Sequence, residues 1–262
     1  MRPLVELRHY RGMDAVLADL ATQQDELSGL LAGRDDLEWQ RPSPCEGWTV
    51  ADVVLHLAQT NELSIASAQG RLPEVAKGMG GPERTNTVDD SAALMVEAER
   101  GAPVRALHDR WLDGVETLRA VLAAADPHER VMWVAGELSI RTLATTRLAE
   151  TWIHTGDVAA AFGVALEPTD RLYHIARLAW RTLPYAFMRA GRELHGPVAF
   201  ELRSPYGAAC DFVPDDPPLT VVRGEVAELC NVAARRVDPA DTGLTATGPD
   251  AGAVLELVCT YA

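Results

Sequence analysis

The feature that most constrains this chain is the helical spacing of apolar residues through its first two-thirds. Over residues 14–31, leucines and a valine recur at three- and four-residue intervals, and the pattern ends before Gly33. Three further long helices are expected on the same grounds: from Thr49, over about residues 90–125 with a break near 101–103, and over residues 139–163. Four amphipathic helices joined by loops predict a helical bundle.

Local signals indicate where these helices begin and end. Thr49 and Asp52 have the spacing of a capping box, in which each side chain bonds the other residue's backbone N–H. Gly163 is a favourable residue just beyond a helix C-terminus. Residues 71–88 contain glycines and prolines with little periodicity, and they are expected to form a long loop.

The pattern changes near residue 166. Alternating runs typical of strands follow, VAFELRS, AACDFVP and LTVVRG, separated by the turn signals SPYG and PDDPP. Thr169 is expected to cap one more helix through Met188, EVAELCNVAARR and AGAVLELVCTYA to form short helices, and LTATG a further strand. We therefore predict a mainly α chain with an α+β C-terminal part, the helical bundle spanning residues 1–166 and the smaller α+β domain residues 167–262.

The charge balance excludes some classes of partner. Lysine and arginine number 24 against 38 aspartates and glutamates, a net charge of -14, whereas binding nucleic acid requires a basic face. The chain has no run of 18 apolar residues, so no membrane span is expected, and its first residues lack the apolar segment of a signal peptide. The four cysteines form no CxxC pair, which favours reduced thiols and a cytoplasmic location.

One group of side chains has the chemistry of a metal site. Glu150 and His154 stand four residues apart on one face of a helix, where a carboxylate and an imidazole can bind one divalent cation. His56, on the expected inward face of the helix from Thr49, would complete a His₂Glu set. Three protein ligands with an open position are typical of catalytic zinc, although Fe²⁺, Ni²⁺ and Mn²⁺ also fit. The alternatives are a plain surface Glu–His pair and a core histidine.

Two stretches resemble a known family. PSPCEGWTVADVVLHLA, taken with RLAETWIHTGDVAAAFG, is similar to the mycothiol-dependent maleylpyruvate isomerase family, which belongs to the DinB-like superfamily of metal-binding four-helix bundles. The family pattern Glu-x-x-x-His-x-x-Asp matches at Glu150, His154 and Asp157, and its Gly-Trp-Thr-Val motif matches over residues 47–57. The resemblance implies that His56, Glu150 and His154 bind the metal. It also implies a DinB-like four-helix bundle followed by a small sterol-carrier-like α+β domain.

The resemblance further implies a metal-dependent enzyme that uses mycothiol. Such an enzyme, an isomerase or an S-transferase, would act on a small electrophilic and anionic substrate through a metal-activated thiolate. Its partners would then be a small-molecule substrate and a low-molecular-weight thiol, and the protein would be a monomer or a homodimer. Arg235 or Arg236 matches a family arginine on the thiol-cofactor side, with an ordinary cation at a helix end as the alternative.

Other residues near the metal set have expected roles of their own. Arg147 is a candidate anchor for an anionic substrate, and a salt bridge to Glu150 or Glu137 is the alternative. Asp157 is expected to orient His154. Cys45 is expected to pack in its loop rather than act as a nucleophile, because the sequence shows neither a GxSxG motif nor a Cys–His arrangement.

Two other classes of function remain open from the sequence. A metal-dependent hydrolase would use the same three ligands with a bound water in place of the thiol. A non-enzymatic protein would bind a small ligand without needing His56. Turnover without added thiol would identify the hydrolase.

Overall fold

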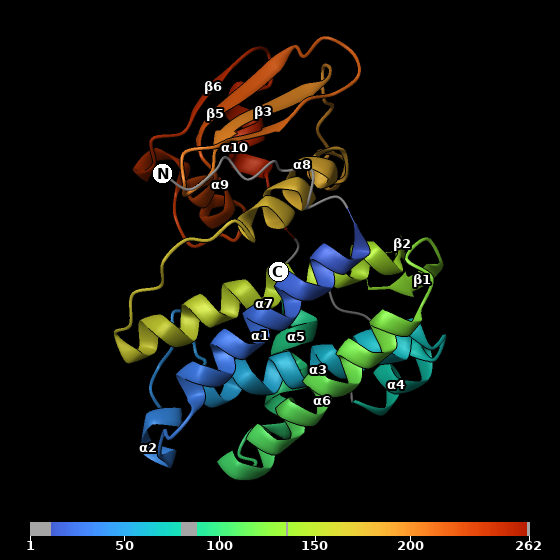
Figure 1. Cartoon of the computed structure of the whole chain (residues 1–262), viewed down its shortest axis with the longest axis vertical. Coiled ribbons are helices and arrows are strands. Elements are labelled where there is room, and N and C mark those ends of the chain that lie inside the picture. Colours follow the sequence, from blue (N-terminus) through green and yellow to red (C-terminus); the bar gives the residue numbers. More distant parts are fainter. Residues whose placement is uncertain (1–11, 80–87, 135, 261–262) are drawn as a thin grey trace. The chain divides into compact units, whose positions relative to one another are not determined.

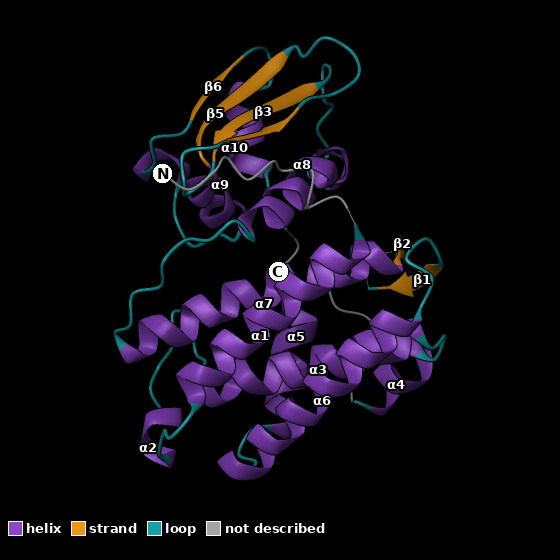
Figure 2. Cartoon of the chain, viewed as in Figure 1, coloured by secondary structure: helices purple, strands orange, loops and turns teal. Residues whose placement is uncertain are grey.

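The computed structural model describes residues 12–79, 88–134 and 136–260 (Figure 1). The chain divides into two compact units, a helical unit, Met13–Leu166, and a second unit that includes Glu167–Ala262. Helices dominate the described residues, and the larger of the two sheets found among them lies in the second unit (Figure 2). This confirms the predicted fold class, a mainly α chain with an α+β C-terminal part. None of the described helices is long and apolar enough to span a membrane.

The helical unit is built on four long helices that pack side by side (Figure 1). Helix α3 (Val50–Ala68) packs against both α6 (Val104–Ala124) and α7 (Ile140–Phe162), and α1 (Met13–Leu31) packs against α7 and α6. Their apolar faces form the core, which includes the buried rings of Trp39 and Trp111. All four helices occur where the apolar spacing predicts them.

The ends of these helices follow the local signals. At the start of α3, Thr49 accepts a hydrogen bond from the backbone N–H of Asp52, and the Asp52 carboxylate accepts one from the backbone N–H of Thr49. Ser139 caps α7 by accepting a hydrogen bond from the backbone N–H of Thr142, and Gly163 ends the helix in the left-handed conformation, with φ of 69°. The predicted break also occurs, because α5 (Val88–Glu99) ends before Pro103 and α6 begins after it.

The structure contains several short helices and strands that the sequence pattern does not predict. Part of the segment expected as a loop forms helix α4 (Leu72–Gly78), which has a proline in its first turn, and residues 80–87 lie outside the described part. The one-turn helix α2 (Asp36–Trp39) and the antiparallel hairpin of β1 (Arg130–Trp133) and β2 (Gly136–Ser139) were not predicted. Elements this short contain too few repeats for hydrophobic periodicity to reveal them.

In its described residues, the second unit combines a four-stranded sheet with three α-helices and one short 3-10 helix, Pro239–Asp241. The strand order is β4-β3-β5-β6, with β3 parallel to β5 and the two outer pairs antiparallel. Its elements are α8 (Leu172–Arg189), β3 (Val198–Arg203), β4 (Ala209–Phe212), β5 (Thr220–Glu225), α9 (Val226–Ala233), β6 (Thr245–Thr247) and α10 (Ala251–Leu257). The strands match the alternating runs of the sequence.

Three helix ends in this unit differ from the prediction. Helix α9 ends at Ala233, before the end of the predicted helix over residues 225–236. Thr169 does not cap α8, because the capping position is taken by Arg171, and the Thr169 hydroxyl instead accepts a hydrogen bond from Arg171 Nε at 2.9 Å. Helix α10 ends at Leu257 and is therefore shorter than the predicted helix over residues 251–262, the last two of which are outside the described part.

Candidate functional site

Packing of α3 on α7 brings the three predicted metal ligands together. His56 Nε2 lies 2.6 Å from Glu150 Oε1, and the ring centroids of His56 and His154 are 5.0 Å apart. One donor atom from each of the three side chains lies within 4.8 Å of the other two. Two helices thus present two imidazoles and one carboxylate to a single point, which is the arrangement a divalent cation needs.

The electrostatics of this group keep its members in forms that can bind a metal. Burial lowers the pKa of His56, and this effect outweighs the neighbouring Glu150 carboxylate, which raises it. Burial alone would raise the pKa of Glu150, but the charge of Arg147 and the hydrogen bond from His56 lower it to about 2. At neutral pH the group therefore contains an ionised carboxylate and an uncharged His56 imidazole.

Arg147 lies behind Glu150 as its counter-charge. Its guanidinium is fully buried, with Nη1 at 3.5 Å from Glu150 Oε2 and Nη2 donating a hydrogen bond to Thr60 Oγ1 at 2.9 Å. Burial lowers the pKa of Arg147, while the charge of Glu150 raises it. Nε and Nη1 have no hydrogen-bond partner among the described residues. The structure thus shows the Glu150 ion pair that the sequence offered as the alternative to a substrate anchor.

Asp157 contacts His154 from the next turn of α7. Its buried carboxylate oxygen Oδ2 lies 2.9 Å from His154 Nδ1. A carboxylate accepts hydrogen bonds, so Nδ1 is the donor, and in a neutral imidazole with this tautomer the lone pair is on Nε2. A hydrogen bond of this kind selects the tautomer and the ring orientation of a metal-binding histidine.

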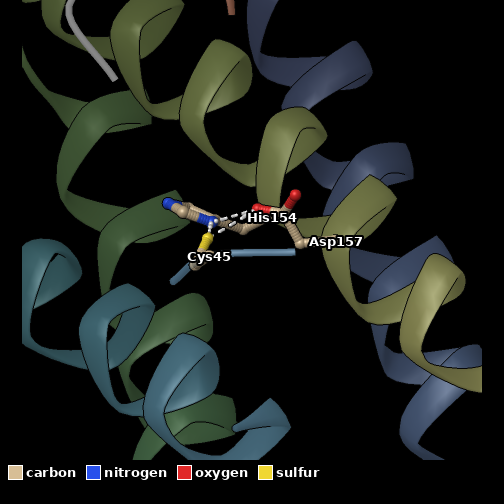
Figure 3. A group of neighbouring side chains, drawn as sticks. All are labelled: Cys45, His154 and Asp157. Carbon is tan, nitrogen blue, oxygen red and sulfur yellow. Dashed lines mark hydrogen bonds and ion pairs between the residues drawn. The ribbon is translucent and has the colours of Figure 1, made fainter. Parts of the chain in front are cut away.

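Cys45 is the site residue that sequence reasoning underrated. Figure 3 shows its thiol directed at the His154–Asp157 pair, with Sγ donating to Asp157 Oδ2 at 3.2 Å and lying 3.9 Å from His154 Nδ1. Cys45 packs against the core of the helical unit, as expected, and its thiol makes in addition a contact with α7 that was not predicted. The sequence held no local sign of this contact, because 109 residues separate Cys45 from His154.

The loop that contains Cys45 also places an aromatic ring beside the site. The ring centroid of Trp48 lies 5.2 Å from that of His56 and 6.4 Å from that of His154. The isolated β-bridge between Pro42 and Thr49 closes this loop just before α3 begins. Trp48 was not predicted as a site residue, although it belongs to the Gly-Trp-Thr-Val motif that carried the resemblance.

The two arginines expected on the thiol-cofactor side lie just after α9, in the second unit. Arg235 adopts the left-handed conformation, with φ of 58°, and its Nη1 donates to the backbone oxygen of Glu256 at 2.7 Å. Arg236 Nη1 donates to the backbone oxygen of Ala234 at 2.9 Å. Each side chain therefore binds a backbone carbonyl of its own unit.

Comparison with known proteins identifies relatives along nearly the whole chain. The "Uncharacterized protein MT0041" of Mycobacterium tuberculosis (strain CDC 1551 / Oshkosh) is 30% identical over 250 residues, which cover 94% of this chain and 95% of the relative. A protein of a second strain of that species matches equally.

Two solved structures share the fold of this chain. They are the crystal structures of the mycothiol-dependent maleylpyruvate isomerase and of its histidine-to-alanine mutant. Their TM-scores are 0.62 and 0.61 at 19% and 18% identity, and each match covers 93% of this chain and 97% of the other.

The family assignment comes from the helical unit. Residues 20–159 match the family described as "Mycothiol maleylpyruvate isomerase N-terminal domain". This range is more than half of the 262 residues, and it contains His56, Glu150, His154 and the Cys45–Trp48 loop. Because this match covers more than half of the chain, the chain belongs to the mycothiol maleylpyruvate isomerase family.

Proposed function

We propose that this protein is a metal-dependent enzyme that uses mycothiol to transform a small electrophilic, anionic substrate, as an isomerase or a thiol transferase. The observation that carries the proposal is the convergence of His56, Glu150 and His154 from two helices of the family fold. Mycothiol and an isomerase reaction come from the names of the family and of the similar solved structures.

The residues present fit a divalent metal. Two imidazoles and one carboxylate with an open fourth position suit Zn²⁺ best, while Ni²⁺, Fe²⁺ and Mn²⁺ accept the same donors. His56 Nε2 donates a hydrogen bond to Glu150 Oε1 at 2.6 Å, and the two groups would hold a divalent metal once that proton is released. The lowered pKa values of His56 and Glu150 reduce the cost of removing protons from the ligands.

The chain's own residues would bind and orient what the chemistry needs. A bound metal would lower the pKa of the mycothiol thiol and so supply a thiolate nucleophile at neutral pH. Arg147 balances the charge of Glu150 and holds its second oxygen, and Asp157 holds His154 in the tautomer that exposes Nε2. We assign Arg147 to Glu150 rather than to the substrate, because the guanidinium is fully buried.

We also propose a role for two arginines of the second unit, Arg235 and Arg236. Arg235 is exposed just after α9, and one of its guanidinium nitrogens binds a backbone carbonyl. A guanidinium has five N–H donors in a planar fork and can bind a carboxylate or the polar groups of a thiol cofactor. We propose Arg235 or Arg236 as the contact to mycothiol.

Metal content is the measurement that tests this proposal. We expect about one equivalent of a transition metal in the zinc-reconstituted protein, by elemental mass spectrometry, and loss of that metal in His56→Ala, Glu150→Ala and His154→Ala. His128→Ala, in the turn before β1, serves as the matched control and should retain the metal. A reconstituted protein without metal, or variants that keep it, would refute the metal centre.

Thiol dependence separates the enzyme classes once the metal is established. The loaded protein is mixed with an electrophilic cis-alkene that bears carboxylates, with and without mycothiol. Isomerisation or adduct formation that requires mycothiol supports the proposal. Hydrolysis without any thiol would assign the same three ligands to a metal-bound water instead.

A further inference from the structure

The carboxylate of Asp157 receives two hydrogen bonds at one oxygen. His154 Nδ1 lies 2.9 Å from Oδ2 and Cys45 Sγ lies 3.2 Å from the same atom (Figure 3). Asp157 is only 2% exposed, so protein groups must replace the water that such a carboxylate would otherwise bind. The thiol is therefore one of the donors that satisfy a buried charge.

The position of Cys45 is set by the hydrogen bonds of its own loop. The Cys45 backbone N–H donates to Ser43 Oγ at 3.2 Å, and its carbonyl accepts from the Trp48 N–H at 3.0 Å. Ser43 bonds the Trp48 carbonyl through both its N–H and its hydroxyl, each at 2.9 Å. A closed network of this kind directs the thiol to Asp157 through backbone geometry.

We propose that Cys45 is a positioning residue of the metal centre, acting through Asp157 on His154. This inference rests on the proposed function, in which His154 binds a metal through Nε2. The thiol and the imidazole N–H hold Asp157 Oδ2 from two sides, and Asp157 in turn sets the tautomer and the angle of the His154 ring. Removing a partner that orients a metal-binding histidine typically lowers metal affinity by about 10- to 100-fold.

A different role for Cys45 is direct metal ligation. Donor atoms of Cys45, His154 and Asp157 also lie within 4.8 Å of one another. A cation bound there would need the lone pair of His154 Nδ1 and would break the 2.9 Å hydrogen bond to Asp157. The hydrogen-bonded arrangement instead leaves Nε2 for the site with His56 and Glu150, which favours positioning over ligation.

Zinc affinity of the full chain tests the proposal without any turnover. Zinc binding is measured by competition with a chelator, with no thiol cofactor present. We expect Cys45→Ala to weaken zinc binding by about 10-fold and Cys45→Ser, which keeps a donor, to recover most of it. Cys259→Ala, a half-buried cysteine of the second unit, is the matched control and should bind as the parent does.

A double-mutant cycle shows whether the effect passes through Asp157. In the Asp157→Asn background, Cys45→Ala should add little, since the carboxylate on which it acts is gone. Equal zinc affinity of Cys45→Ala and the parent would overturn the proposal, as would full additivity of the two substitutions. Failure of the parent to bind zinc would instead refute the metal centre itself, and this role with it.

The absorption spectrum of the cobalt-loaded protein gives a second test, which does not depend on how well the alanine variant folds. If Cys45 is a positioning residue, the cobalt-loaded parent and Cys45→Ser should both lack a thiolate-to-cobalt charge-transfer band. A band present in the parent and lost in Cys45→Ser would make Cys45 a ligand and overturn the positioning role. Circular dichroism of each metal-free variant serves as the check on folding.

Discussion

Glu150 lies between two groups that both stabilise its ionised carboxylate. Its Oε1 accepts from His56 at 2.6 Å, and its Oε2 faces the buried guanidinium of Arg147 at 3.5 Å. Burying a carboxylate costs free energy unless a cation or hydrogen-bond donors compensate it. In the metal-free protein Arg147 provides that compensation, which is why the pKa of Glu150 is low despite burial. A bound metal would also compensate the negative charge of Glu150.

This pairing makes a stability prediction for Arg147. Replacing it by methionine leaves the Glu150 carboxylate, whose side chain is 12% exposed, without its cation, so the variant measured without added metal should lose about 3–5 kcal/mol of unfolding free energy in urea denaturation. Saturating zinc should restore part of the loss, because the metal returns a positive charge to Glu150. Adding Glu150→Gln to Arg147→Met should also recover stability. A single variant as stable as the parent would show that the ion pair contributes nothing.

Helices α3 and α7 begin at capping residues, Thr49 and Ser139, that can be recognised in the sequence. Helix α10 has no side-chain cap, and other contacts fix its start. Asp250 precedes α10, but its side chain accepts from the backbone N–H of His195 at 2.9 Å and from His195 Nδ1 at 2.7 Å. The backbone N–H of Asp250 donates to Thr220 Oγ1, at the start of β5. Asp250 thus ties the segment before β3 to both β5 and α10.

This tie should depend on pH. The hydrogen bond and charge of Asp250 raise the pKa of His195 in the folded protein. The protonated imidazole therefore stabilises the fold below the unfolded-state pKa of about 6.5, and this stabilisation is lost as pH rises through the higher folded-state pKa. We expect the difference in unfolding midpoint between the parent and His195→Ala to be largest near pH 5.5 and to shrink by pH 9. A difference that is the same at both pH values would contradict this.

At the scale of the whole molecule, the candidate metal ligands all belong to one of the two units. His56 lies on α3, and Glu150 and His154 lie on α7. Zinc at about 100 times its dissociation constant should stabilise the folded state by about 2.7 kcal/mol. We expect hydrogen exchange to slow in α3 and α7 on adding zinc, and to change little in β3 and β5. Protection that rises equally in the sheet would contradict a metal effect confined to the helical unit.

The amino-acid pattern alone is enough to predict the long helices, their caps and the residue types of the candidate metal site. Helix ends such as Thr49 and Gly163 are decided within one turn, and periodicity is written into each long helix, so both are visible without a partner. The spacing of Glu150 and His154 is likewise local. Elements of one or two turns, such as α2 and α4, carry too little of this signal.

The contacts between residues of α3, its preceding loop and α7 follow only from the tertiary structure. The contact between His56 and Glu150 spans 94 residues, and that between Cys45 and Asp157 spans 112. Periodicity identifies the buried face of a helix but does not state its partner, its axial register or the path of the preceding loop. For that reason spacing and resemblance predict His56, Glu150 and His154 as candidate ligands, whereas the contact between Cys45 and Asp157 is seen only in the tertiary structure.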